Sequence, residues 1–195
     1  MNYTDVIYRE IEPKRLVPDE RELAARLGGG CMMLSADESL EELYEIMRPR
    51  YSAVRVPVSY EDSAVLIDGY RIESEGLMKN LSGAAEAYLI AVTLGTEVDT
   101  YLHRLGFLSG ARRFAADAVA SALAEALVCL ADRELSCSLD CRPRFSPGYG
   151  DLPLELQKDL FRILDCNKRL GLTLNESLLM SPTKSVTAIV GIYKN

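Results

Sequence analysis

Two segments near the start of the chain have the hydrophobic spacing of amphipathic helices. They cover residues 17–27 and 38–48. In the second segment apolar residues recur at intervals of three or four from Leu40 to Met47, and acidic residues occupy the other side. The sequence therefore predicts two helices within a charged N-terminal segment, residues 1–50.

Short strands follow this segment. Apolar residues alternate over 54–58, and a proline within the run indicates an edge strand. Two further apolar runs, 64–67 and 70–72, flank Asp68 and Gly69. An Asp-Gly pair between apolar runs predicts a two-residue hairpin, because both central residues must adopt a positive φ.

The rest of the chain mixes helices and strands without strict alternation. The pattern predicts a buried strand, a short helix, a long helix, a further helix and two strand-like runs, at 87–94, 96–103, 109–135, 151–170, 172–179 and 185–193. Gly106 is expected to end the short helix, and Asp151 to cap the helix that follows it. Recurring hairpins favour an α+β fold with a largely antiparallel sheet over a doubly wound parallel fold.

Composition limits the chemistry of the chain. Its 195 residues fit one domain, 1–195, in which an α+β core, 51–195, follows the N-terminal segment. The net charge of −7 argues against nucleic-acid or anionic-membrane binding. His103 is the one histidine, which excludes a His-rich metal site and a catalytic histidine pair.

The lack of long apolar segments bears on where the protein works. No stretch approaches about 18 uncharged apolar residues, and the first residues lack a secretion signal, so we expect a cytoplasmic protein. Five cysteines then indicate mostly reduced thiols. Cys137, Cys141 and Cys166 lack the spacing of a metal site, and we predict no bound metal.

Glu125 is the one acid on the central faces of the long helix. Its helical neighbours three and four residues away are Ser121, Ala122, Val128 and Cys129, and none of them neutralises it. Such an acid either reaches solvent at the edge of an exposed face or faces a cleft that holds a cation or a donor.

The loop Arg144–Asp151, with the sequence RFSPGYGD, has the most unusual composition in the chain. Glycine, proline and serine favour a defined turn with bare backbone that can pack against a ligand. Arg144 provides a fork for a carboxylate or phosphate, and Tyr149 a face for stacking. The alternative is a tight turn with a surface arginine and a packed tyrosine.

This loop and three later runs resemble the activation domain of cobalamin-dependent methionine synthase, most closely its short, free-standing versions. The runs are LELQK at 154–158, GLTLNES at 171–177 and PTKSVTA at 182–188. The resemblance is close over residues 84–192 and loose over 1–80. It implies an α+β fold around a twisted antiparallel sheet.

The resemblance also implies a function and its partners. In that family the domain binds S-adenosylmethionine (AdoMet), and a one-electron donor, typically flavodoxin, reduces inactive cob(II)alamin while the AdoMet methyl group traps it as methylcobalamin. The chain would then be an AdoMet-dependent reactivation subunit for a separate methionine synthase or related corrinoid protein, which carries the cobalamin.

The family's binding residues map onto the loop and the long helix. Arg144 would hold the AdoMet carboxylate, the backbone at Ser146, Pro147 and Gly148 would line the ligand, and Tyr149 would shape the pocket. The glutamate of the family's site region falls on Glu125, in an electrostatic and not a catalytic role.

Two features of the family pattern have no match in this sequence. Full-length members use an aspartate near the start of the domain, and the loose resemblance over residues 1–80 does not assign it to a position in this sequence. They also use tyrosines on a strand beyond the one near Ile192, whereas this sequence stops at Asn195. Two other functions therefore stay open: a non-catalytic module that docks on a corrinoid protein with a degenerate AdoMet site, and an AdoMet-sensing regulator.

Overall fold

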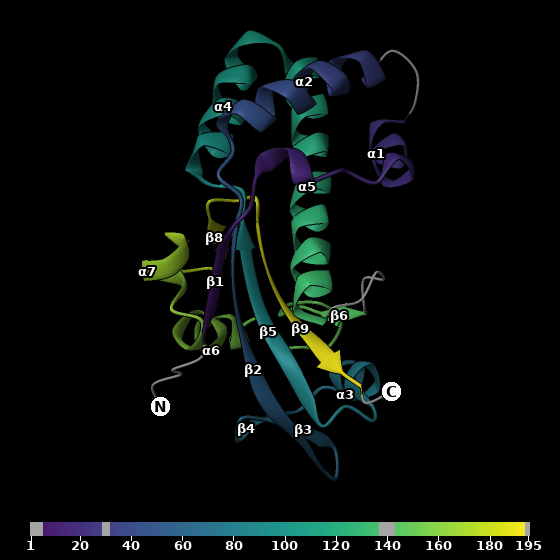
Figure 1. Cartoon of the computed structure of the whole chain (residues 1–195), viewed down its shortest axis with the longest axis vertical. Coiled ribbons are helices and arrows are strands. Elements are labelled where there is room, and N and C mark those ends of the chain that lie inside the picture. The colour runs from purple at the N-terminus through teal and green to yellow at the C-terminus, as the bar shows by residue number, and fades with distance from the viewer. Residues whose placement is uncertain (1–5, 29–31, 137–142, 194–195) are drawn as a thin grey trace.

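The computed structural model describes residues 6–28, 32–136 and 143–193. A long, curved antiparallel sheet lies at the centre of the molecule (Figure 1). Its strand order is β4-β3-β2-β5-β9-β6, and β1 pairs with β2 beside β3. The strands are β1 (Ile7–Glu10), β2 (Arg50–Glu61), β3 (Ala64–Ile67), β4 (Tyr70–Ile72), β5 (Glu86–Thr93), β6 (Arg144–Phe145) and β9 (Ser185–Ile192). All of these pairings are antiparallel, which confirms the predicted α+β class.

The predicted hairpin is present between β3 and β4. Asp68 has a φ of 50° and Gly69 a φ of 81°, as a two-residue turn requires. Residues 70–72 pair back onto residues 65–67. The edge-like pattern predicted at 54–58 is confirmed for Val54 to Pro57, which pair with β5 alone, because on the other side β1 pairs with residues 50–53 and β3 with residues 58–61. Pro57 is tolerated there because its backbone faces away from β5; on that side its carbonyl accepts from the N–H of Asp68, and its missing N–H removes no ladder hydrogen bond.

Helices cover both faces of the sheet. The 27-residue helix α5 (Gly110–Ser136) lies against one face, and three helices pack around it: α1 (Glu20–Leu27), α2 (Met32–Ile46) and α4 (Thr96–Leu108) (Figure 1). The opposite face carries α3 (Glu75–Leu81), α6 (Leu156–Ile163) and α7 (Cys166–Leu170). A 3-10 turn at Pro13–Arg15 and a small β7–β8 ladder (Thr173–Leu174 with Met180–Ser181) complete the described elements.

Two hydrophobic clusters, one on each face, explain why β5 reads as a continuous apolar run. Ile90 and Val92 join the cluster under α5, whereas Leu89 and Ala91 join the cluster under α6 and α7. Successive side chains of a strand point to opposite faces, so a strand covered on both faces must be apolar throughout.

Several helix boundaries differ from those expected; α2, for example, begins at Met32 and not at residue 38. Residues 151–170 form α6 and α7 instead of one helix, because Asp165 adopts a left-handed backbone with φ of 52°. Gly106 lies inside α4, which runs on to Leu108. Asp151 caps α3, which is distant in sequence, and does not cap the helix after it.

The long helix α5 follows the prediction and is apolar on opposite sides. Its length and composition alone would let it cross a membrane, so the expectation that no segment approaches this limit was too strict. In the protein 61% of that apolar window is buried, which is typical of a core helix covered by its own domain. Length and composition therefore give only weak evidence for a membrane span here.

Candidate functional site

The structure brings together the two charged residues that the sequence singled out separately. Glu125 lies in the middle of α5, and Arg144 lies on β6, which pairs with β9 through Arg144 and Val190. Nη2 of Arg144 and Oε2 of Glu125 form an ion pair. The two side chains are 29% and 32% exposed, so the pair is partly shielded from water but reachable from solvent.

The surroundings of Arg144 combine partial burial with acidic neighbours. Burial lowers the pKa of the Arg144 guanidinium from its ordinary value, and the negative charge of Glu22 on α1 opposes this shift. Arginine nevertheless stays protonated in proteins. A charged guanidinium that has already lost part of its hydration binds a carboxylate strongly, because less water must be removed when the ligand arrives.

The Glu125–Arg144 pair lies in the wall of an open cleft of about 420 Å³ between α1, the segment before it and the second half of α5. Pockets for small organic ligands occupy roughly 300–1,000 Å³, so the cleft has a suitable size. Its lining combines three acids and three arginines with apolar surface. These residues are Arg15, Val17, Asp19, Glu22, Glu125, Ala126, Cys129, Leu130, Arg133 and Arg144.

The rest of the predicted loop site lies beside the cleft. Ser146, Pro147, Gly148 and Tyr149 are not among the residues that line it. The loop closes on itself: the N–H of Tyr149 donates to the carbonyl of Ser146 at 3.0 Å, and the N–H of Gly148 donates to Leu152 at 2.9 Å. These two donors hold the turn, in which Gly148 has φ of 83°, and are thus engaged within the loop.

Tyr149 projects outward from this turn. Its side chain is 69% exposed, and its ring meets the edge of the Phe145 ring at a centroid distance of 5.5 Å. The ring therefore offers an open face at the surface, whereas Phe145 packs into the core.

Asp151 fixes the far end of the loop to α3. Its Oδ1 accepts from the Ser74 hydroxyl at 2.6 Å, and its Oδ2 accepts from the N–H of Glu75 at 2.6 Å. The N–H of Gly76 donates to Oδ1 at 3.2 Å. The loop that carries Arg144 is thereby anchored to a helix about 75 residues earlier in the chain.

Sequence reasoning missed the wall that α1 contributes. Asp19 caps α1 by accepting from the N–H groups of Arg21 and Glu22 at 2.9 Å. The side chains of Asp19 and Glu22 both line the cleft. The capping pattern was visible in the sequence, but nothing in it showed that α1 packs beside α5. Cys129 and Arg133 were missed for the same reason, since they are one and two turns beyond Glu125.

Two further polar residues, His103 and Lys184, have contacts within the fold. His103 lies inside α4 and meets the edge of the Phe107 ring, with ring centroids 4.9 Å apart. Lys184 pairs with Asp117 at 3.0 Å and donates to Ser121 at 2.9 Å, so it ties the turn before β9 to α5.

The two cysteines that the structure describes, Cys129 and Cys166, are not grouped with other metal-binding side chains. Cys137 and Cys141 lie outside the described residues. Burial raises the pKa of Cys166 to about 12, which keeps this thiol protonated and a poor ligand. Within the parts of the chain that the structure describes, no three His, Cys, Asp or Glu side chains are grouped as a metal ion would need.

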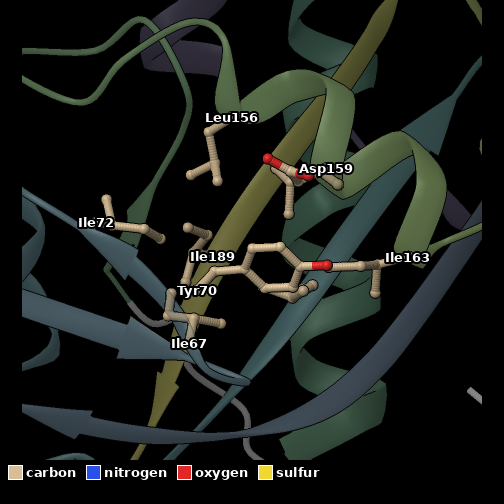
Figure 2. A pocket seen from close by; sticks show the side chains of 9 residues that line it. Ile67, Tyr70, Ile72, Leu156, Asp159, Ile163 and Ile189 are labelled. Atoms are coloured by element: carbon tan, nitrogen blue, oxygen red, sulfur yellow. The ribbon is translucent and has the colours of Figure 1, made fainter. Parts of the chain in front are cut away.

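A second hollow lies between α6 and the sheet, where Tyr70 crosses a niche lined by isoleucines and leucines (Figure 2). The niche has about 10 Å³ of space for a water centre, which is room for roughly one water molecule. Asp159 stands at its rim and pairs with Arg162. The niche is therefore a packing feature and too small for an organic ligand.

Two comparisons relate the chain to known proteins. Its fold is similar to the fold in a crystal structure of the MetH reactivation domain bound to AdoHcy, with a TM-score of 0.74 and 18% sequence identity over 94% of this chain and 77% of that chain. Residues 141–194 match the family model described as the vitamin B12 dependent methionine synthase activation domain. No curated protein matches the chain.

These two findings confirm the resemblance predicted from the sequence. The chain has the fold of a methionine synthase activation domain and carries the sequence pattern of that family in its last third.

Proposed function

We propose that the chain is a reactivation component for a cobalamin-dependent methionine synthase and binds AdoMet in the cleft between α1 and α5. The Arg144–Glu125 ion pair in the cleft wall carries this proposal. The amino-acid end of AdoMet bears a carboxylate and an ammonium group, and the sulfonium adds a second positive charge. Arg144 would take the carboxylate, while Glu125 would turn to the positive groups, so both charges stay compensated.

The residues of the chain act here by binding and orientation. AdoMet supplies the methyl group, a one-electron donor such as flavodoxin supplies the electron, and a separate corrinoid protein carries the cobalamin that is methylated. Arg144 and Glu125 fix the methionine end of the ligand, so the methyl group is held in one place for the partner to meet. Such positioning replaces a random encounter with an oriented one.

The domain limits and the location belong to the same proposal. We infer one activation-like domain over residues 1–195, in which α1 is part of the ligand cleft. We also infer a cytoplasmic protein that works without a metal ion of its own, since the cobalt belongs to the partner.

Calorimetry with AdoMet tests the binding step. Arg144→Ala should weaken AdoMet binding by about 1.5–3 kcal/mol, or roughly 10–150-fold, because a hydrogen bond between charged groups is lost. Arg71→Ala is the matched control, since Arg71 lies on β4 and pairs with Glu61 and Glu73 away from the cleft. Equal affinity of wild type and Arg144→Ala would refute the role of Arg144. A wild-type protein that binds no AdoMet up to millimolar concentrations, alone or with the corrinoid protein, would refute the mechanism.

One observation supports a second function. The N–H groups of Gly148 and Tyr149 are engaged within the loop, and residues 146–149 do not line the cleft, which is what a degenerate AdoMet site predicts. The chain would then be a non-catalytic module that docks on a corrinoid protein. Tight binding to that protein without AdoMet-dependent formation of methylcobalamin would favour this second function.

A further inference from the structure

The junction of α4 and α5 exposes large apolar side chains. Phe107 is 79% exposed, Leu108 74% and Phe114 52%. Adjacent exposed apolar side chains of this size are uncommon on a surface that contacts only water, and they typically mark an interaction site. We call this surface the α4–α5 tip, and it comprises His103, Arg104, Phe107, Leu108, Arg113 and Phe114.

The charge of the tip is opposite to that of the whole chain. From Thr100 to Ala116 the sequence contains three arginines and no acid, whereas the chain carries a net charge of −7. Arg112 is neutralised by Glu42, because Nη2 of Arg112 lies 2.9 Å from Oε1 and 3.0 Å from Oε2 of the Glu42 carboxylate. Among the residues that the structure describes, neither Arg104 nor Arg113 forms an ion pair. Two positive charges are thus available beside the apolar side chains.

Two contacts within the tip orient some of its side chains. Phe107 is held by the edge of His103, with ring centroids 4.9 Å apart. Arg113 lies over Gly106, where an added Cβ would come within 3.3 Å of its side chain. Side chains that are already ordered lose less conformational entropy on binding, which favours a docking surface.

The tip lies on the side of α5 that leads to the candidate site. Phe114 precedes Glu125 by 11 residues, which is three helical turns, so both residues share one face about 16 Å apart. The two helices meet at the end of the molecule away from α3 and the C-terminus, and α5 runs from there toward β6 (Figure 1). A folded domain of about 100 residues has a radius of gyration of roughly 13 Å, so one partner can cover both places.

We propose that the α4–α5 tip is a docking surface for the corrinoid protein, which would present an apolar recess to Phe107 and Leu108 and an acidic rim to Arg104 and Arg113. The proposal rests on the proposed function for the identity of the partner. A second copy of this chain docked tip to tip would bring the same arginines together. Outside the tip, the net charge of −7 would be repelled by an anionic membrane.

The test measures the dissociation constant between the full chain and the cobalamin-loaded methionine synthase by surface plasmon resonance. Phe107→Ser with Leu108→Ser, and separately Arg104→Glu with Arg113→Glu, should each weaken binding about tenfold or more. Leu179→Ser is the control, because Leu179 is 61% exposed and lies between β7 and β8. Added salt should weaken the wild-type complex and have less effect on the arginine variant.

AdoMet calorimetry on the same variants separates the two proposals. Unchanged AdoMet affinity with lost corrinoid binding supports docking at the tip. Unchanged corrinoid binding in both variants overturns it and leaves the proposed function standing. A wild-type chain that does not bind the corrinoid protein also overturns the docking proposal. If the wild-type chain binds neither the corrinoid protein nor AdoMet, the proposed function is overturned with it. Wild-type binding to vesicles of equal parts phosphatidylcholine and phosphatidylglycerol, lost in the variants, would assign the tip to a membrane and overturn the docking proposal.

Discussion

At the scale of single residues, Gly76 decides how closely the loop and α3 approach. A Cβ at this position would lie 2.6 Å from Cζ of Phe145 and 2.8 Å from Oδ1 of Asp151. Both distances are shorter than a real contact allows, and the Phe145 ring is buried, so it has little room to move. Only glycine fits between the helix and the loop that carries Arg144.

Gly76→Ala should therefore destabilise the protein. Overpacking costs about 1–3 kcal/mol, which outweighs the gain of up to about 1 kcal/mol that alanine brings to a helix. The free energy of unfolding in urea measures the difference. Gly110→Ala is the matched control, because a Cβ there meets nothing within 4 Å, and this variant should be neutral or slightly more stable. Equal effects of the two substitutions would contradict the close approach at Gly76.

At the scale of elements, Asp151 joins the loop after β6 to the start of α3. The Ser74 hydroxyl, followed by the N–H groups of Glu75 and Gly76, holds the pKa of Asp151 below its ordinary value of 3.8. These donors favour the carboxylate over the acid form. Because the folded pKa is lower than the unfolded one, the stabilisation is present above the unfolded pKa and is lost as the pH falls through the folded pKa.

Asp151→Asn should remove this acid-dependent stabilisation. We expect the wild type to be more stable than the variant from pH 7 down to about pH 5, and the difference to shrink at lower pH. Thermal unfolding across this pH range provides the measurement. Asp62→Asn, in the turn between β2 and β3, serves as control because asparagine also tolerates its positive φ of 39°. A wild type and an Asp151→Asn variant with parallel pH profiles would show that Asp151 does not couple the two elements.

At the scale of the whole molecule, the sheet separates two hydrophobic clusters that share its strands. Leu123 on α5 is fully buried in one cluster, and Leu164 after α6 is fully buried in the other. Since β5 and β9 contribute side chains to both clusters, neither cluster can come apart without exposing the other face of the same strands. The two sides should unfold together.

Leu123→Ala and Leu164→Ala test whether the chain behaves as one domain. Each should lower the free energy of unfolding by about 2–5 kcal/mol, the usual effect of a cavity in a packed core. Each should also shift one common transition, seen alike by far-ultraviolet circular dichroism and by tyrosine fluorescence. Two separate transitions, with each substitution moving a different one, would contradict the single domain.

Local patterns were sufficient for the elements that depend on near neighbours. The Asp68-Gly69 hairpin follows from the positive φ that a two-residue turn demands, and the long helix follows from its apolar periodicity. Boundaries set by distant contacts could not be predicted. Asp151 is a residue type that commonly caps the helix following it in sequence. In the fold its carboxylate instead accepts from the free N–H groups at the start of α3, which is distant in sequence.

The candidate site divides in the same way. The sequence determined which residues carry unusual chemistry, because an isolated acid in an apolar helix and an arginine in a glycine-rich loop are visible without a fold. Only the tertiary structure decided that Glu125 and Arg144 form an ion pair, that α1 brings Asp19 and Glu22 to the same cleft, and that Tyr149 points outward. The physical reason is that partners in an ion pair or a cleft are chosen by how the helices pack on the sheet, and that packing depends on both apolar clusters together.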